Sequence, residues 1–71
     1  MPDRWIVATY VNNQLISAKS CGSQATARKY TKNRAKTLAH NEFLTACMET
    51  PDIWFVYDED IIRYEVVVVT L

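Results

Sequence analysis

The segment from Gln24 to Thr50 contains neither glycine nor proline, and this property constrains the fold more than any other feature of the sequence. Ala, Lys, Arg, Leu and Glu are common in the segment, and all of them favour helix. Ser23 precedes it, and a serine at that place can cap a helix N-terminus. Pro51 follows it and disfavours helix at the residue before. The segment therefore predicts one main helix.

The apolar residues of this segment do not share one helical face throughout. A narrow stripe at helical spacing comes first, and it consists of Ala27, Thr31, Ala35 and Leu38. Phe43 and Cys47 point almost opposite to that stripe. A straight helix over 24–49 would also be about 39 Å long. Either the helix breaks near His40-Asn41, with Asn41 capping a short second helix, or it overhangs and packs its last turns on another chain. We expect the break.

Residues 5–19 predict a β-hairpin. Residues favoured in strands dominate Trp5–Val11, and Gln14–Lys19 follows after Asn12-Asn13. Asparagine tolerates positive φ, so the Asn-Asn pair fits a two-residue turn. Both faces of this hairpin are half apolar, which leaves open the question of which face is buried. The only glycine of the chain, Gly22, marks the change of direction before the helix.

Residues 53–70 predict a second β-hairpin around the acidic turn 58–60. With Glu59 and Asp60 at its tip, one face is wholly apolar and is the expected core face. That face consists of Ile53, Phe55, Tyr57, Ile62, Tyr64 and Val66. The opposite face then carries Arg63, Glu65 and four apolar residues, which are Trp54, Val56, Val67 and Val69.

These elements predict a single α+β domain over residues 1–71. Its expected order is ββαββ, with two antiparallel hairpins forming a sheet and one main helix on one face. A domain of this size is marginally stable, so oligomerisation would add stability. Cys21, Cys47 and the single histidine lack the spacing of a zinc site, and we expect neither a metal nor a cofactor. Without an apolar leader segment a cytoplasmic location is expected, and the two thiols are expected to be free and mostly buried.

The basic residues concentrate on the predicted helix, where no acid lies between Asp3 and Glu42. Four of them fall within one arc of the helix, namely Arg28, Lys29, Lys32 and Lys36. Such an arc can follow a phosphate backbone or an acidic protein surface. It can equally be a solvated helix face whose long side chains cover apolar surface. The acidic turn 58–60 is expected to be solvated.

The apolar residues point to a second candidate contact surface. One helix can cover only one face of a four-stranded sheet, so the other face is expected to expose apolar side chains. Contiguous exposed apolar surface usually marks an interaction site. The residues expected to contact a protein partner or a second copy of the chain are Trp54, Val56, Val67, Val69, Phe43 and Cys47.

A catalytic function is not expected. Cys47 and His40 are seven residues apart, which on a straight helix separates them by about 10 Å, too far for a hydrogen bond. No phosphate-binding glycine loop is present, because the chain has a single glycine. No apolar run approaches the 18 residues of a transmembrane helix, so no membrane partner is expected.

In its size, ββαββ order and polarised charge, the chain resembles the small inhibitor proteins that phages use against host enzymes and defence systems, anti-CRISPR proteins among them. The resemblance covers the whole chain and involves no particular residue. It implies stoichiometric inhibition, by protein–protein contact in the host cytoplasm, of a complex that handles nucleic acid or serves defence. The alternative function is a nucleic-acid-binding module that uses the basic helix.

Overall fold

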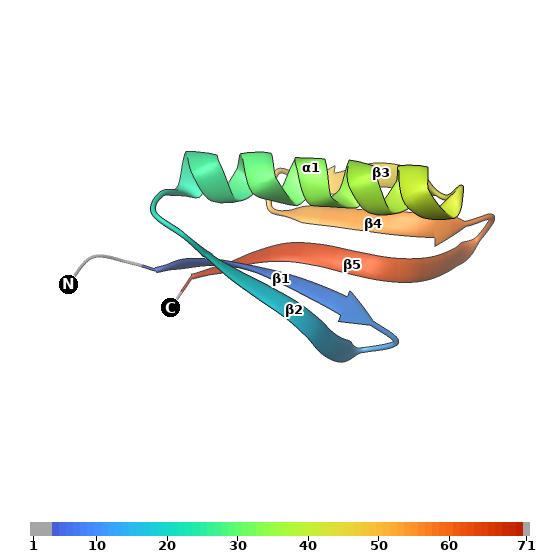
Figure 1. Cartoon of the computed structure of the whole chain (residues 1–71), viewed down its shortest axis with the longest axis horizontal. Helices are drawn as coiled ribbons and strands as arrows, with labels where there is room; N and C mark the ends of the chain where they lie inside the picture. Colours follow the sequence, from blue (N-terminus) through green and yellow to red (C-terminus); the bar gives the residue numbers. More distant parts are fainter. Residues whose placement is uncertain (1–3, 71) are drawn as a thin grey trace.

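The computed structural model describes residues 4–70, which form one helix and five strands of a single sheet (Figure 1). The elements are β1 (Trp5–Val11), β2 (Gln14–Cys21), α1 (Gln24–Glu42), β3 (Thr45–Thr50), β4 (Ile53–Asp58) and β5 (Ile61–Thr70). The strands lie in the order β2-β1-β5-β4-β3, and every neighbouring pair is antiparallel. The α+β class is confirmed, but the element order is ββαβββ and not ββαββ.

The helix ends within two residues of the predicted break at His40-Asn41. Its last residue is Glu42, and Phe43 then adopts the left-handed conformation with a φ of 57°. The Leu44 N–H donates a hydrogen bond to the Ala39 carbonyl at 2.8 Å, which satisfies a terminal carbonyl of the helix. The chain therefore leaves the helix through a left-handed cap that is usually formed by glycine.

The residues after this cap form β3, so the predicted short second helix is wrong. β3 pairs antiparallel with β4, and this pairing satisfies its backbone groups on one side. Ala46 packs against the core on the side of α1, whereas Cys47 lies opposite Phe55 on the other side of the sheet. Cys47, which is out of phase with the apolar stripe of the helix, therefore follows the two-residue period of a strand.

A β-bulge in the second hairpin decides which side of β4 is buried. The predicted pair of Tyr57 and Ile62 is present, but beyond it the register shifts, so that Phe55 lies opposite Glu65 instead of Tyr64. Because successive side chains of a strand alternate between faces, a shift of one residue moves all later side chains of one strand to the other face.

Trp54 and Val56 are therefore buried beneath α1, with 9% and 0% of their surfaces exposed. The prediction that they lie on the uncovered face is wrong, and so is the prediction that Phe55 is a core residue. On β5 the predicted core residue Val66 is fully buried at 0% exposure. The sequence thus indicates the correct face of β5 at Tyr64 and Val66, the wrong face at Ile62, which is 42% exposed on the other side, and the wrong face of β4.

The helix packs closely on the sheet because its buried side chains are small. They are Ala27, Thr31, Ala35 and Ala39. The hydroxyl of Thr31 donates to the Ala27 carbonyl at 2.8 Å, so the one polar group among them is satisfied. The predicted stripe of Ala27, Thr31 and Ala35 is confirmed as the core-facing side of α1.

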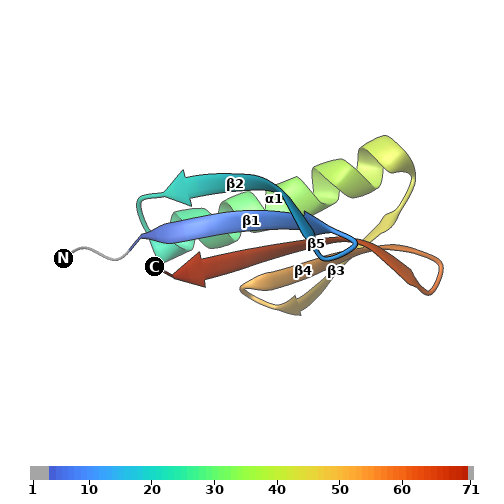
Figure 2. The ribbon, with the colours of Figure 1, turned by 90° about the horizontal axis from the view of Figure 1, so that it is seen from below.

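The helix connects β2 to β3, which are the two edge strands of the sheet. It crosses one face of the sheet obliquely, as the view from below shows (Figure 2). No other element within residues 4–70 covers the opposite face. We call this opposite side of the sheet the open face.

Candidate binding surfaces on opposite sides of the sheet

The open face is defined by side chains that alternate with the buried core residues along each strand. Strand pairing aligns these residues in rows across the sheet. The larger apolar members are Ile6, Tyr10, Leu15, Ile53, Phe55, Tyr57, Ile62, Val67 and Val69. Leu15, Ile62 and Val69 are 57%, 42% and 37% exposed, and the others are half-buried by their neighbours. The open face is therefore a largely apolar surface in contact with solvent.

One row of the open face combines aromatic rings with a carboxylate. Glu65, on the central strand β5, lies opposite Tyr10 on one side and Phe55 on the other. Side chains paired in this way have Cβ atoms about 5 Å apart. Phe55 and Tyr57 stack edge to face, with ring centroids 6.1 Å apart and an interplanar angle of 73°. Two aromatic side chains thus flank the one acidic group of the central strand, and a third ring, Tyr57, packs against one of them.

The structure brings together only some of the predicted apolar contact residues. Val67 and Val69 lie on the open face, and Cys47 lies at its β3 edge. Phe43 is 97% exposed, but it lies at the C-terminus of α1, apart from the open face. The largest surface residues that sequence reasoning missed are Tyr10, Phe55 and Tyr57. Hydrophobicity alone does not show which residues of β4 lie on the open face, because β4 is apolar at every position from Ile53 to Tyr57 and shows no alternation.

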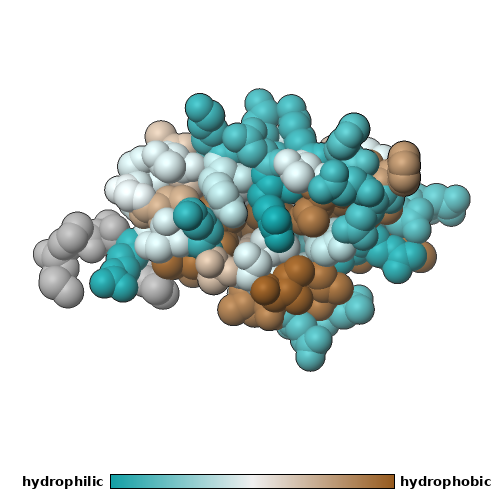
Figure 3. Space-filling view, viewed as in Figure 1, coloured by the Kyte–Doolittle hydropathy of each residue, from teal (hydrophilic) through white to brown (hydrophobic). Residues whose placement is uncertain are grey.

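The basic residues of α1 lie on the other side of the molecule. Lys29, Lys32 and Lys36 are exposed, and the outer surface of the helix is largely hydrophilic (Figure 3). In the same view an apolar patch lies over β2, where Leu15 and Ile16 are 57% and 53% exposed. The three exposed lysines of α1 therefore lie on a different side of the molecule from the apolar side chains of the sheet, while Lys19 and Arg63 are exposed cations on the strands themselves.

Arg28 differs from the three lysines because it has a partner within the protein. Its Nε lies 2.8 Å from Oδ1 of Asp52 in the β3–β4 turn, and both side chains are about 40% exposed, at 42% and 38%. The hydrogen bond to Asp52 raises the pKa of Arg28 above its ordinary value. Arg28 therefore links α1 to the β3–β4 turn. Lys29 and Lys32 have no ion pair within residues 4–70, and they line a shallow cleft of about 320 Å³ together with Trp54.

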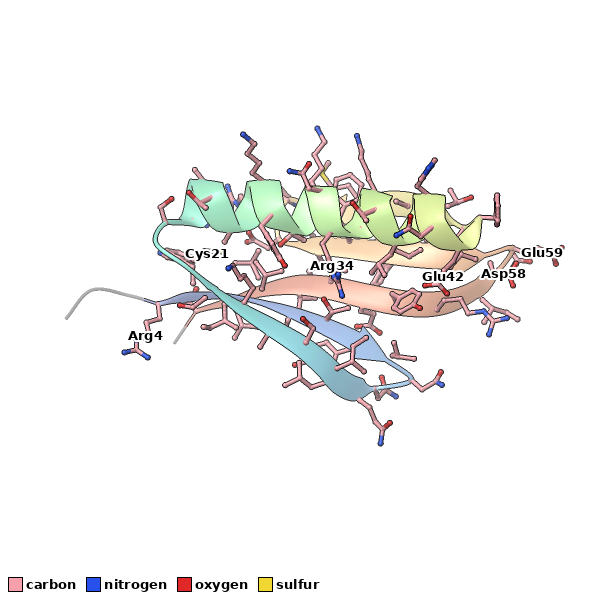
Figure 4. All side chains as sticks on the ribbon, in the orientation of Figure 1. Arg4, Cys21, Arg34, Glu42, Asp58 and Glu59 are labelled. Atoms are coloured by element: carbon pink, nitrogen blue, oxygen red, sulfur yellow. The ribbon has the colours of Figure 1, made fainter. Side chains whose placement is uncertain are left out.

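A second set of charged groups lies at the C-terminal end of α1. The Tyr64 hydroxyl donates a hydrogen bond to the Glu42 carboxylate, which raises the pKa of Tyr64 above 10.0. Arg34 points from α1 toward the sheet (Figure 4), and its Nε is buried without a hydrogen-bond partner in the described part of the chain. At the acidic turn, Asp58 pairs with Arg63 at 3.1 Å. These contacts are internal and hold the helix end and the hairpin in place.

Neither a family model nor a curated protein nor a solved structure matches this chain.

The two cysteines and the histidine lie on three different elements. Cys47 lies on β3 at the open face and His40 is exposed on α1, so these two residues do not share one helix. Cys21 and Cys47 are both free thiols, but Cys21 is half-buried and Cys47 is exposed, so the expectation that they are mostly buried is wrong. Within residues 4–70, no three His, Cys, Asp or Glu side chains are placed to hold a metal ion. In the same range no helix is long and apolar enough to cross a bilayer.

Proposed function

We propose that the chain is a protein-binding module that docks a partner through the open face. The supporting observation is the continuity of apolar side chains over β1, β5 and β4 on the side away from α1. Surfaces of this kind are rare on isolated soluble domains and usually mark interaction sites. Tyrosine and phenylalanine are enriched in the centres of interfaces, and both occupy the centre of this one.

The dimensions of the open face suit an interface of ordinary size. Strands about 4.8 Å apart make a five-stranded sheet about 19 Å wide, and β5 from Ile62 to Val69 extends over about 24 Å. This outline of about 460 Å², before the relief of the protruding side chains is added, is more than half of the roughly 800 Å² that each partner contributes to a stable complex. Full burial of a leucine or isoleucine side chain contributes about 1.5–3 kcal/mol, and Leu15 and Ile62, which are 57% and 42% exposed, would each contribute about half of that.

Site-specific photo-crosslinking in the cells that make the protein tests this proposal. A benzophenone amino acid replaces Tyr57 on the open face or, as a matched control, the exposed aromatic Phe43 at the end of α1. The proposal expects covalent adducts with a defined protein from position 57 and none from position 43. Adducts from position 43 alone would contradict it and would favour a contact at the helix C-terminus.

A second candidate function, polyanion binding by α1, is favoured by Lys29, Lys32 and Lys36. These cations are exposed along the helix, and no ion pair within residues 4–70 involves them. Binding through phosphates would weaken by about 0.9 log units per log unit of salt for each contact on duplex DNA. Fluorescence anisotropy with a labelled duplex, at low and high salt, measures this slope. Lys19→Glu, at an exposed position of β2, changes the net charge by the same two units and is the matched control for Lys32→Glu.

The finer hypothesis of an inhibitor of a host nucleic-acid-handling or defence complex stays a prediction. With an element order of ββαβββ, the resemblance that suggested it retains only the size of the chain and its charge separation. The partner that is captured from position 57 bears directly on this hypothesis. A nuclease or a subunit of a nucleic-acid-binding complex is expected from it.

A further inference from the structure

Glu65 lies at the centre of the open face. β5 is the third of five strands, and Glu65 is near the middle of its length. Its cross-strand neighbours are Tyr10 and Phe55, and Val67 follows on the same face. Glu65 is half-buried, so water still reaches its carboxylate.

No cation within the described chain pairs with this carboxylate. The ion pairs of residues 4–70 are those of Arg28 with Asp52 and of Arg63 with Asp58. Arg63, the nearest basic residue along β5, is thus held by another acid. A partner that covers the open face with apolar side chains alone would remove the water from Glu65 without replacing its hydrogen bonds, which is strongly unfavourable.

A second copy of the chain is a poor occupant for the same reason. Two identical open faces related by a two-fold axis at their centre would bring the two Glu65 carboxylates toward each other. Like charges in a desolvated contact repel, and Arg63, which lines the same shallow hollow as Glu65, is already paired with Asp58. The charge of Glu65 therefore favours a different protein that carries the complementary charge.

We propose that the partner of the open face presents an arginine, flanked by apolar side chains, to the carboxylate of Glu65. This inference rests on the proposed function of the open face. A guanidinium can bind a carboxylate through two parallel hydrogen bonds. The aromatic faces of Tyr10 and Phe55 on either side attract the same cation. The surrounding valine and isoleucine side chains accommodate the apolar neighbours of the arginine.

A displayed library of random 16-residue peptides tests the proposal with the whole chain as target. The selected peptides are expected to share an arginine next to apolar residues. Glu65→Gln, which keeps the size of the side chain, is expected to weaken their binding by about tenfold or more. Glu65→Arg is expected to select peptides with Asp or Glu at the shared position instead. Glu59→Gln, at the exposed β4–β5 turn, is the matched control and leaves binding unchanged.

The outcomes separate this inference from the proposed function. Leu15→Ser combined with Ile62→Ser removes exposed apolar surface and should abolish peptide binding if the open face is the site. Peptides that depend on these two residues but carry no cation, and bind Glu65→Gln equally well, overturn the arginine proposal alone. Peptides indifferent to the double variant, or a selection without any binder, contradict both. A dimer of the chain that tightens in Glu65→Gln overturns the arginine proposal in favour of a second copy.

Discussion

Nε of Arg28 lies 2.8 Å from Oδ1 of Asp52, and this ion pair joins the first half of α1 to the β3–β4 turn. The same Asp52 accepts the Val68 N–H at its backbone carbonyl, at 2.8 Å, so one turn residue contacts both the helix and the central strand. Arg28, which the sequence indicates as a contact for an anionic binding partner, is therefore already paired with an acid of the same chain. The helix and the central strand are therefore both joined to this turn.

Replacing Arg28 by Gln is expected to lower the melting temperature slightly at low salt, because an exposed ion pair contributes little stability. The hydrogen bond to Asp52 raises the pKa of Arg28, so the guanidinium stays charged and its contribution does not change with pH near neutrality. Thermal unfolding at low salt and in 1 M NaCl measures the effect. Lys29→Gln is the adjacent control without an ion pair, and equal shifts in both variants would contradict the assignment.

Tyr64 is expected to titrate at higher pH than an ordinary tyrosine, because its hydroxyl donates to the Glu42 carboxylate. The neutral phenol is favoured in the folded state, so this contribution to stability is complete below pH 10.0 and is lost as the pH rises through the folded pKa. Absorbance titration of tyrosinate at 295 nm measures the shift. Tyr64→Phe should remove the latest-titrating group, and Glu42→Gln should bring it back toward the ordinary value. A late group that persists in Tyr64→Phe would refute the assignment.

Truncation of Trp54 is expected to lower the free energy of unfolding strongly, and truncation of Phe43 is expected to leave it almost unchanged. Trp54→Ala removes a core side chain that is only 9% exposed and should cost about 3–5 kcal/mol of unfolding free energy. Phe43→Ala removes a ring that is 97% exposed and should change the unfolding free energy by less than about 0.5 kcal/mol. Urea unfolding followed by far-UV circular dichroism compares them. A similar loss in both variants would argue against the register of β4.

Phe43→Gly is expected to stabilise the protein by about 0.5–1 kcal/mol, because a residue with a side chain is unfavourable in the left-handed region. Phe43 has a φ of 57° at the helix C-cap, and glycine adopts this conformation without a steric penalty. The midpoint of urea unfolding measures the gain, with Phe43→Ala as the reference for removal of the ring. Destabilisation relative to Phe43→Ala would show that the cap is not left-handed.

Local signals in the sequence predict the helix and both hairpin turns. The hydroxyl of Ser23 accepts the Thr26 N–H at 3.2 Å, as its place before the helix indicates. Asn12 and Asn13 have φ angles of 51° and 66°, as a two-residue turn requires. The absence of glycine and proline from Gln24 to Thr50 locates the helix but not its end, because β3 lies within the same segment.

The remaining features depend on contacts between distant residues. β3 is a strand because β4 supplies its hydrogen bonds, and no local pattern in Ala46, Cys47 and Met48 reveals that pairing. The bulge near Arg63 is equally non-local, and it alone moves Trp54 and Phe55 to the sides opposite to those predicted. The candidate surface was therefore predicted correctly on β5, at Val67 and Val69, and incorrectly on β4.

The first and last strands pair with each other at the centre of the sheet, where Ile6 lies opposite Val69 (Figure 1). During synthesis on the ribosome, β1 and β2 can form a hairpin early, but their sheet partner emerges only with the final strand. Pairing between such distant segments is slow, because a long loop must close before any contact rewards it. The nascent chain therefore exposes the apolar residues of β1 until β5 has emerged, and this interval is when a chaperone would have the most to bind.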